Sequence, residues 1–206
     1  LLTLLLTAIP IRGFSYTDDQ VVEFGECYYK VVSGTKLTLS FIGTKASKTG
    51  QLNLPAKVTD KHGYILTVIG AEYNPQYRSG GITSVHLPET MEFLDGYVFS
   101  GASLATMNIP KNLKKIEHGA WSSIYAAPKF TVHPQNQNFE NDANGALYTK
   151  GRKTLLSVPS NVQLQGGKYT VHPDVKIIST AAFQSVQGLT KIVLPKNLEK
   201  VYEGYP

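Results

Sequence analysis

The sequence predicts a mainly β solenoid of 22–23-residue repeats, with a β-rich N-terminal cap and one inserted hairpin. Three observations predict it: a unit that recurs with fixed internal spacing, a short strand of alternating apolar and polar residues in each unit, and a proline that ends several of these strands. A chain of 206 residues with 42% hydrophobic and 17% charged side chains can build a core, which excludes a disordered protein. The net charge of +5 favours acidic surfaces only weakly and does not indicate nucleic acid.

The recurring unit is clearest in two successive segments, residues 82–99 and 104–121. The apolar residue before the proline is Leu87 in the first segment and Ile109 in the second, 22 residues later. In each segment a large aromatic residue, Phe99 or Trp121, follows 12 residues after that position. We therefore expect the aromatic residues to plug the core of each repeat.

Two further copies begin at residues 169 and 189, after a longer excursion. A unit of this length cannot bury its apolar face alone, but it can do so when it stacks on its neighbours, which is the logic of a solenoid. The last copy stops at the position where its aromatic residue should fall. We therefore expect a solenoid over residues 51–206 that is incomplete at its C-terminus.

Two other segments have patterns of their own. Residues 16–50 are predicted to form the N-terminal β cap, because Val21 to Thr38 alternates well enough for two strands with a turn at Ser33 and Gly34. In the excursion, residues 146–148 and 154–159 are separated by the turn-forming residues 149–152. This pattern predicts the inserted hairpin.

The chain begins with an apolar run, Leu1 to Ile9, which is followed by Pro10. The run is too short to span a bilayer, which needs about 20 residues, but it fits the central region of a secretory signal. Residues 1–15 are therefore predicted to be the remnant of a signal peptide, with a buried N-terminal strand or helix as the alternative.

The repeats resemble the BspA-like leucine-rich-repeat family, the short-repeat surface proteins of anaerobic bacteria and some mucosal protists. The resemblance covers about residues 21–206 and is most specific in the opening segment 22–31, the first repeat 52–70 and the hairpin-bearing repeat 130–159. It implies a leucine-rich-repeat solenoid with one strand per repeat in a parallel sheet. It also implies an exported, non-enzymatic protein used for adhesion or protein binding.

No motif for catalysis or metal binding stands out. The single cysteine, Cys27, excludes an internal disulfide framework and a cysteine-based zinc cluster, and it falls in a predicted strand. No two of the five histidines have metal-ligand spacing, although stacking of the repeats can bring His133 and His172 together. No Gly-x-Ser-x-Gly elbow is present. We expect no cofactor, and an enzyme with a hidden pair of carboxylates is the weakest alternative.

Alternation also predicts which side chains face outward from the strands. If Val85 and Leu87 point inward, period two sends Ser84 and His86 outward. Along the repeats this gives a polar strip without carboxylates that becomes basic toward its C-terminal end. Its candidate binding residues are His86, Asn108, Lys129, Thr131, Lys168, Thr170 and Lys191. The strip is either a solvated sheet face or a docking surface for an acidic or hydroxyl-rich partner.

Aromatic residues divide into two groups. Trp121 and Phe183 fall at or beside the plug position and are predicted to be core. Tyr73, Tyr77 and Tyr125 lie in loops between units and are candidate contacts, because aromatic side chains anchor protein and sugar ligands.

These features lead to two hypotheses for the function. The first is a secreted or cell-surface protein that binds host or neighbouring-cell surface proteins, extracellular-matrix proteins among them. The alternative is a carbohydrate-binding or nutrient-capture module, for which glycans are the partners. Neither hypothesis involves nucleic acid or a transmembrane segment.

Overall fold

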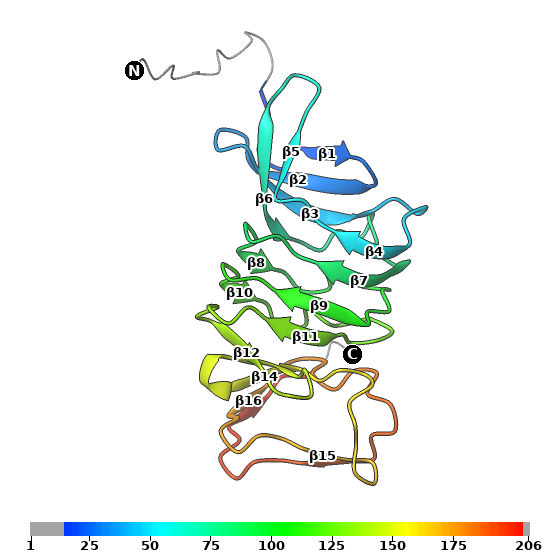
Figure 1. Ribbon diagram of the computed structural model, residues 1–206, viewed down its shortest axis with the longest axis vertical. Helices are drawn as coiled ribbons and strands as arrows, with labels where there is room; N and C mark the ends of the chain where they lie inside the picture. Colours follow the sequence, from blue (N-terminus) through cyan, green and yellow to red (C-terminus); the bar gives the residue numbers. More distant parts are fainter. Residues whose placement is uncertain (1–14, 204–206) are drawn as a thin grey trace.

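The computed structural model describes residues 15–203, which form an elongated stack of β-strands (Figure 1). The predicted signal-peptide remnant lies almost wholly outside these residues. The main sheet has four parallel strands: β4 (Gly50–Asn53), β7 (Ile82–His86), β9 (Thr106–Ile109) and β11 (Lys129–Val132). These are the repeat strands that the sequence predicts, and the leucine-rich-repeat solenoid is confirmed.

A second sheet joins the N-terminal cap to the repeats. Its strands are β1 (Val21–Phe24), β2 (Cys27–Ser33), β3 (Thr38–Thr44), β5 (Lys57–Thr59), β6 (Ile65–Ala71), β8 (Phe93–Leu94) and β10 (Lys115–Ile116). Strands β1 to β3 form an antiparallel meander, whereas β3, β6, β8 and β10 run parallel. Cys27 is buried in β2, as predicted, and burial raises the pKa of its thiol.

The repeats carry two strands each, where the family resemblance implies one. The additional strand holds the second apolar position of the unit, for example Leu94 in β8, which is fully buried. This position is buried in β8 and in a later repeat at Ile178, and the backbones around it form a short parallel ladder between successive repeats.

The inserted segment contains β12 (Phe139–Asn141), β13 (Leu147–Thr149), the 3₁₀ turn η1 (Lys150–Arg152) and β14 (Thr154–Ser157). Strands β13 and β14 form the predicted antiparallel hairpin, and β12 pairs with β13 on its other side. β14 then pairs in parallel with β16 (Ile177–Ile178), which pairs with β18 (Lys200–Val201). The last two repeat strands, β15 (Lys168–Thr170) and β17 (Lys191–Val193), form a separate parallel pair.

The core contains a row of aromatic plugs. Phe41 of the cap lies 6.4 Å from Phe99, and Phe99 lies 6.5 Å from Trp121 between ring centroids. Trp121 in turn contacts Phe130 of β11 at 4.8 Å. All four side chains are buried, so Trp121 is core as predicted, whereas Phe183 is only partly buried and packs against the C-terminal part of the core.

Gly43 allows the loop after β6 to contact the end of β3. Its φ is 146°, and a Cβ atom there would lie 2.6 Å from the backbone carbonyl of Tyr77. Gly43→Ala should therefore lower the free energy of unfolding by about 1–3 kcal/mol, as overpacking does. Urea denaturation measures this change. Gly25→Ala is the matched control, because Gly25 also has a positive φ, of 60°, but has no atom within 4 Å of the added Cβ. Equal losses in the two variants would contradict the close contact.

Candidate functional site

The main sheet carries the first part of the predicted polar strip on one face. Leu52, Val85, Met107 and Phe130 are buried at successive positions across the sheet. On the opposite face, His86 lies beside Asn53, and Thr131 lies beside Asn108. His86, Lys129 and Thr131 are exposed to solvent. These strands therefore present a polar outer face.

Asn108 belongs to the scaffold of this face. Its Oδ1 accepts a hydrogen bond from Leu87 N at 2.7 Å, and its Nδ2 donates one to Leu87 O at 2.9 Å. Pro88 follows directly and has no N–H to donate. The Asn108 amide thus continues the hydrogen bonding where β7 ends, which gives it a structural role in this face.

The polar strip is divided into two parts. Lys168 and Thr170 lie on β15, and Lys191 lies beside Lys168 on β17, in a sheet separate from that of Lys129. The inserted segment causes the division, because it occupies the free edge of β11. Phe130 N donates to Gly145 O at 3.1 Å, and Val132 N donates to Asn141 Oδ1 at 2.8 Å. β15 therefore cannot pair with β11, and the sequence pattern alone does not reveal this.

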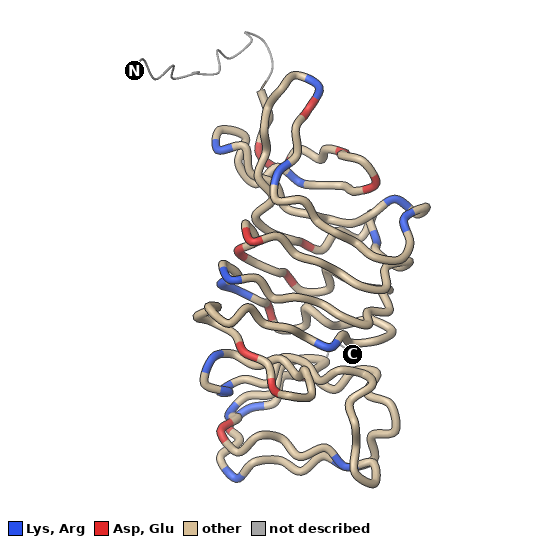
Figure 2. The backbone as a smooth tube through the Cα atoms, in the orientation of Figure 1, with Lys and Arg blue, Asp and Glu red and all other residues tan. Residues whose placement is uncertain are grey.

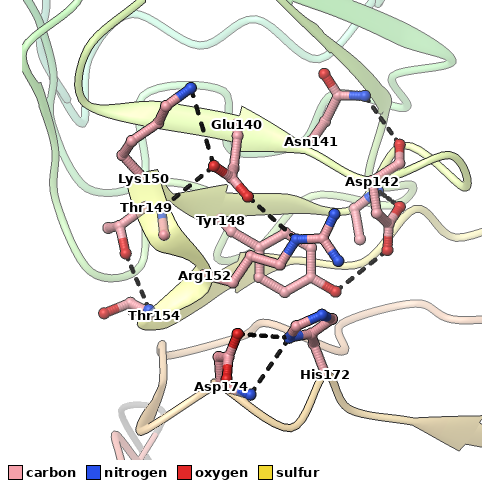
Figure 3. Close-up of polar contacts among 12 residues, drawn as sticks. Glu140, Asn141, Asp142, Tyr148, Thr149, Lys150, Arg152, Thr154, His172 and Asp174 are labelled. Carbon is pink, nitrogen blue, oxygen red and sulfur yellow. Dashed lines mark hydrogen bonds and ion pairs between the residues drawn. The ribbon is translucent and has the colours of Figure 1, made fainter.

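A cluster of titratable groups lies on the inserted segment (Figure 3). Glu140 accepts a hydrogen bond from Arg152 Nε at 3.1 Å and one from Gly151 N at 3.2 Å. Asp142 accepts one from Tyr148 Oη at 3.2 Å and one from Ala146 N at 3.0 Å. Burial, followed by the neighbouring Tyr169 and Asp142, raises the pKa of the Tyr148 hydroxyl. These carboxylates hold the hairpin and its turns, which is a structural role.

His133 and His172, which stacking of the repeats could bring nearer to each other, each accept a hydrogen bond within their own turn. His133 Nδ1 accepts a hydrogen bond from Gln135 N at 3.1 Å, and His172 Nδ1 accepts one from Asp174 N at 3.3 Å. Within residues 15–203, no group of three or more His, Cys, Asp or Glu side chains is arranged to hold a metal ion.

Loop tyrosines that are distant in sequence meet at one edge of the solenoid. Tyr73 and Tyr125 line the same hollow, of about 450 Å³, together with Tyr97 and Arg78. Tyr77 lines a second hollow, of about 510 Å³, which also includes Arg78. The three tyrosines singled out from the sequence therefore belong to two hollows that share one arginine.

A family model for the BspA type leucine rich repeat region matches residues 73–164 and 167–205, with six copies. The chain belongs to this family. The match covers more than half of the chain, but it does not include the cap and first repeat, where the resemblance was also expected. No curated protein matches the chain.

Three solved structures are similar to the chain. One from Bacteroides ovatus ATCC 8483 has a TM-score of 0.53 and 18% identity, over 86% of this chain and 42% of its own. The pneumococcal vaccine antigen PcpA has a TM-score of 0.46 and 14% identity, over 92% of this chain and 67% of its own. A leucine rich cell surface protein from Faecalibacterium prausnitzii A2-165 has a TM-score of 0.42 and 13% identity, over 90% of this chain and 73% of its own.

Two residues of the BspA-type loops were not identified from the sequence as site residues. Arg78 lines both hollows, and Gln184 reaches the first one from a loop that lies 60 residues beyond Ile124 in the sequence. Both are single polar residues in irregular loops, where periodicity gives no signal. In residues 15–203, no helix has the length and apolarity that a membrane crossing requires.

Proposed function

We propose that this BspA-type protein is an exported, non-enzymatic surface protein that binds a protein partner along the outer face of the main sheet. One observation carries the proposal: β4, β7, β9 and β11 expose short polar side chains and contain no Asp or Glu. Figure 2 illustrates this, because the tube is tan along β4, β7 and β9. Stacked repeats offer extended surfaces of this kind to partners.

The lysines of the strip, Lys129 on β11 and Lys168 and Lys191 on the separate pair β15 and β17, extend this polar surface with positive charge. Lys129, Lys168 and Lys191 are exposed, and none of the three forms an ion pair within residues 15–203. By contrast, Lys114 pairs with Glu92 at 2.9 Å and Lys176 pairs with Glu199 at 2.6 Å. The unpaired ammonium groups favour a partner that presents carboxylates.

Family membership and the apolar start of the chain support the location and the partner class. The repeats are those of the BspA type, and a structural neighbour is described as a cell surface protein. The apolar run at residues 1–9 supports export. The proposed partners are proteins on host or neighbouring cells, including those of the extracellular matrix.

Binding to immobilised fibronectin, laminin and collagen tests the proposal. The full chain should bind at least one of them saturably, and the affinity should fall as salt rises, because exposed charge pairs are screened. The triple variant Lys129→Glu, Lys168→Glu, Lys191→Glu should bind about tenfold more weakly, as expected when interfacial charges are reversed.

Lys61→Glu is the control, since Lys61 is an exposed lysine in the turn between β5 and β6, away from the strip. This variant should bind like the wild type. Unchanged binding by the triple variant would contradict a role for the polar strip.

A further inference from the structure

The hollow around Tyr73 and Tyr125 has features of a small-ligand site. Its volume of about 450 Å³ lies in the range of ligand pockets. Tyr73 is 42% exposed and Tyr125 is 76% exposed, although large aromatic side chains usually bury more of their surface. Tyr73 also contacts Tyr97, with 5.7 Å between ring centroids. Three tyrosines from different loops thus line one open hollow.

The loop that carries Tyr125 is held in place by Gln184 and Ser185, which follow the inserted segment in the sequence. Gln184 Oε1 accepts a hydrogen bond from Ser123 N at 3.1 Å, and Gln184 Nε2 donates one to Ile124 O at 3.1 Å. Ser185 Oγ also donates to Ile124 O, at 3.3 Å. Tyr125 therefore projects from a fixed backbone although its ring is exposed, which lowers the entropic cost of binding a ligand.

The second hollow extends this surface with two lysines that are already paired, Lys45 with Glu23 and Lys48 with Glu26. Tyr77 contacts Tyr28 there, with 4.3 Å between ring centroids, and Lys45 and Lys48 contribute to the lining. None of the residues that line the two hollows is Asp or Glu. Their shared residue, Arg78, forms no ion pair within residues 15–203. A free guanidinium is well suited to bind a carboxylate or sulfate in a bidentate manner.

Tyr97 has a left-handed backbone conformation, which small residues adopt at the equivalent positions of other repeats. Its φ is 59°, and the equivalent positions of two other repeats are Gly119 and Ala181, with φ values of 87° and 59°. All three residues accept the same turn hydrogen bond, Ser100 N to Tyr97 O for example, at 2.9 Å. Left-handed backbone at a bulky residue is strained, and such strain concentrates at functional sites.

We propose that the two hollows bind one acidic oligosaccharide. Arg78 pairs with its carboxylate or sulfate, and sugar rings stack on Tyr73, Tyr97 and Tyr125. The geometry favours a saccharide over single-stranded nucleic acid, because a nucleic acid needs a cation for each of several phosphates and this surface offers one unpaired arginine. The proposal does not depend on protein binding at the main sheet.

The test is calorimetric titration of the full chain with four oligosaccharides and, for comparison, with oligo-dT. The acidic probes are a hyaluronan tetrasaccharide and sialyllactose, and the neutral probes are chitotetraose and lactose. At least one acidic probe should bind at least about tenfold more tightly than its neutral counterpart, a difference of about 1.4 kcal/mol. Equal affinity for acidic and neutral probes, no binding of either acidic probe, or tighter binding of oligo-dT would overturn the proposal.

Variants separate binding from folding. Tyr97→Gly should weaken binding of the acidic probe at least about tenfold while the melting temperature stays the same or rises, since glycine relieves the strain. Arg78→Gln should abolish the preference for the acidic probe. Its backbone carbonyl still accepts the hydrogen bond from Thr44, so the fold is kept.

Lys129→Gln, on the main sheet, should leave saccharide binding unchanged, which distinguishes this site from the polar strip. Full affinity in both Tyr97→Gly and Arg78→Gln would overturn the assignment of the hollows.

Discussion

Trp121→Ala should lower the free energy of unfolding by about 3–5 kcal/mol, the cost of truncating a buried aromatic residue. The side chain is 1% exposed and lies between Phe99, at 6.5 Å, and Phe130, at 4.8 Å between ring centroids. Its removal leaves a cavity in the row of plugs, next to the point where the inserted segment interrupts the main sheet. Urea denaturation followed by circular dichroism measures the effect. Tryptophan fluorescence is unsuitable, because the substitution removes the single tryptophan of the chain.

A more conservative variant isolates the reason for this loss. Trp121 Nε1 is buried and has no hydrogen-bond partner within residues 15–203. Trp121→Phe therefore loses packing but no hydrogen bond, and it should cost clearly less than the alanine variant. Tyr125→Ala, at an exposed aromatic residue in the same loop, should stay within about 0.5 kcal/mol of the wild type. Equal losses for alanine and phenylalanine at position 121 would show that the ring does not act through packing.

The repeat architecture could be predicted because its signal is local. The spacing of 12 residues from Leu87 to Phe99 lies within one unit, and both side chains are buried in the core. Alternation within β7 and β9 likewise depends only on neighbouring residues. The second strand of each repeat was not predicted as a strand, because a two-residue ladder leaves no periodic pattern.

The arrangement of the candidate sites depends on contacts between distant segments. Period-two reasoning treats Lys129 and Lys168 as successive members of one strip, but the hydrogen bond from Phe130 to Gly145 separates their sheets. A hairpin can be recognised from its turn residues in the sequence. The sequence does not indicate which sheet edge the hairpin covers. For the same reason, the sequence placed Tyr73 and Tyr125 in loops without indicating that they share a hollow.

One signal in the sequence could have indicated that hollow. When the plug turns are aligned, Tyr97 occupies the position that Gly119 and Ala181 occupy elsewhere. A bulky residue at a position otherwise filled by small residues is locally unfavourable, and local conflicts of this kind are expected at functional sites.

Asn136→Asp should lower the free energy of unfolding by about 3–5 kcal/mol at neutral pH, as burying an uncompensated charge does. Asn136 is 1% exposed and joins the inserted segment to the preceding repeat. Its Nδ2 donates to Pro110 O at 2.7 Å and to Leu113 O at 3.1 Å, while Oδ1 accepts from Asn138 N and Phe139 N, both at 2.8 Å. An aspartate keeps the two accepted bonds, but its other oxygen faces two carbonyl oxygens.

The loss should depend on pH with a definite sign. Burial and the two carbonyl oxygens disfavour the charged form, so the pKa of the introduced carboxyl in the folded state lies above its unfolded value of about 3.9. The folded variant then binds more protons than the unfolded one, and its stability relative to the wild type decreases as pH rises through this interval. Urea denaturation at pH 4 and pH 7 should therefore give the smaller loss at pH 4. Asn138→Asp is the control, because Asn138 is exposed and donates only one side-chain bond, to Leu113 O at 3.2 Å. A pH-independent loss at position 136 would mean that the two carbonyl contacts do not govern the stability of this junction.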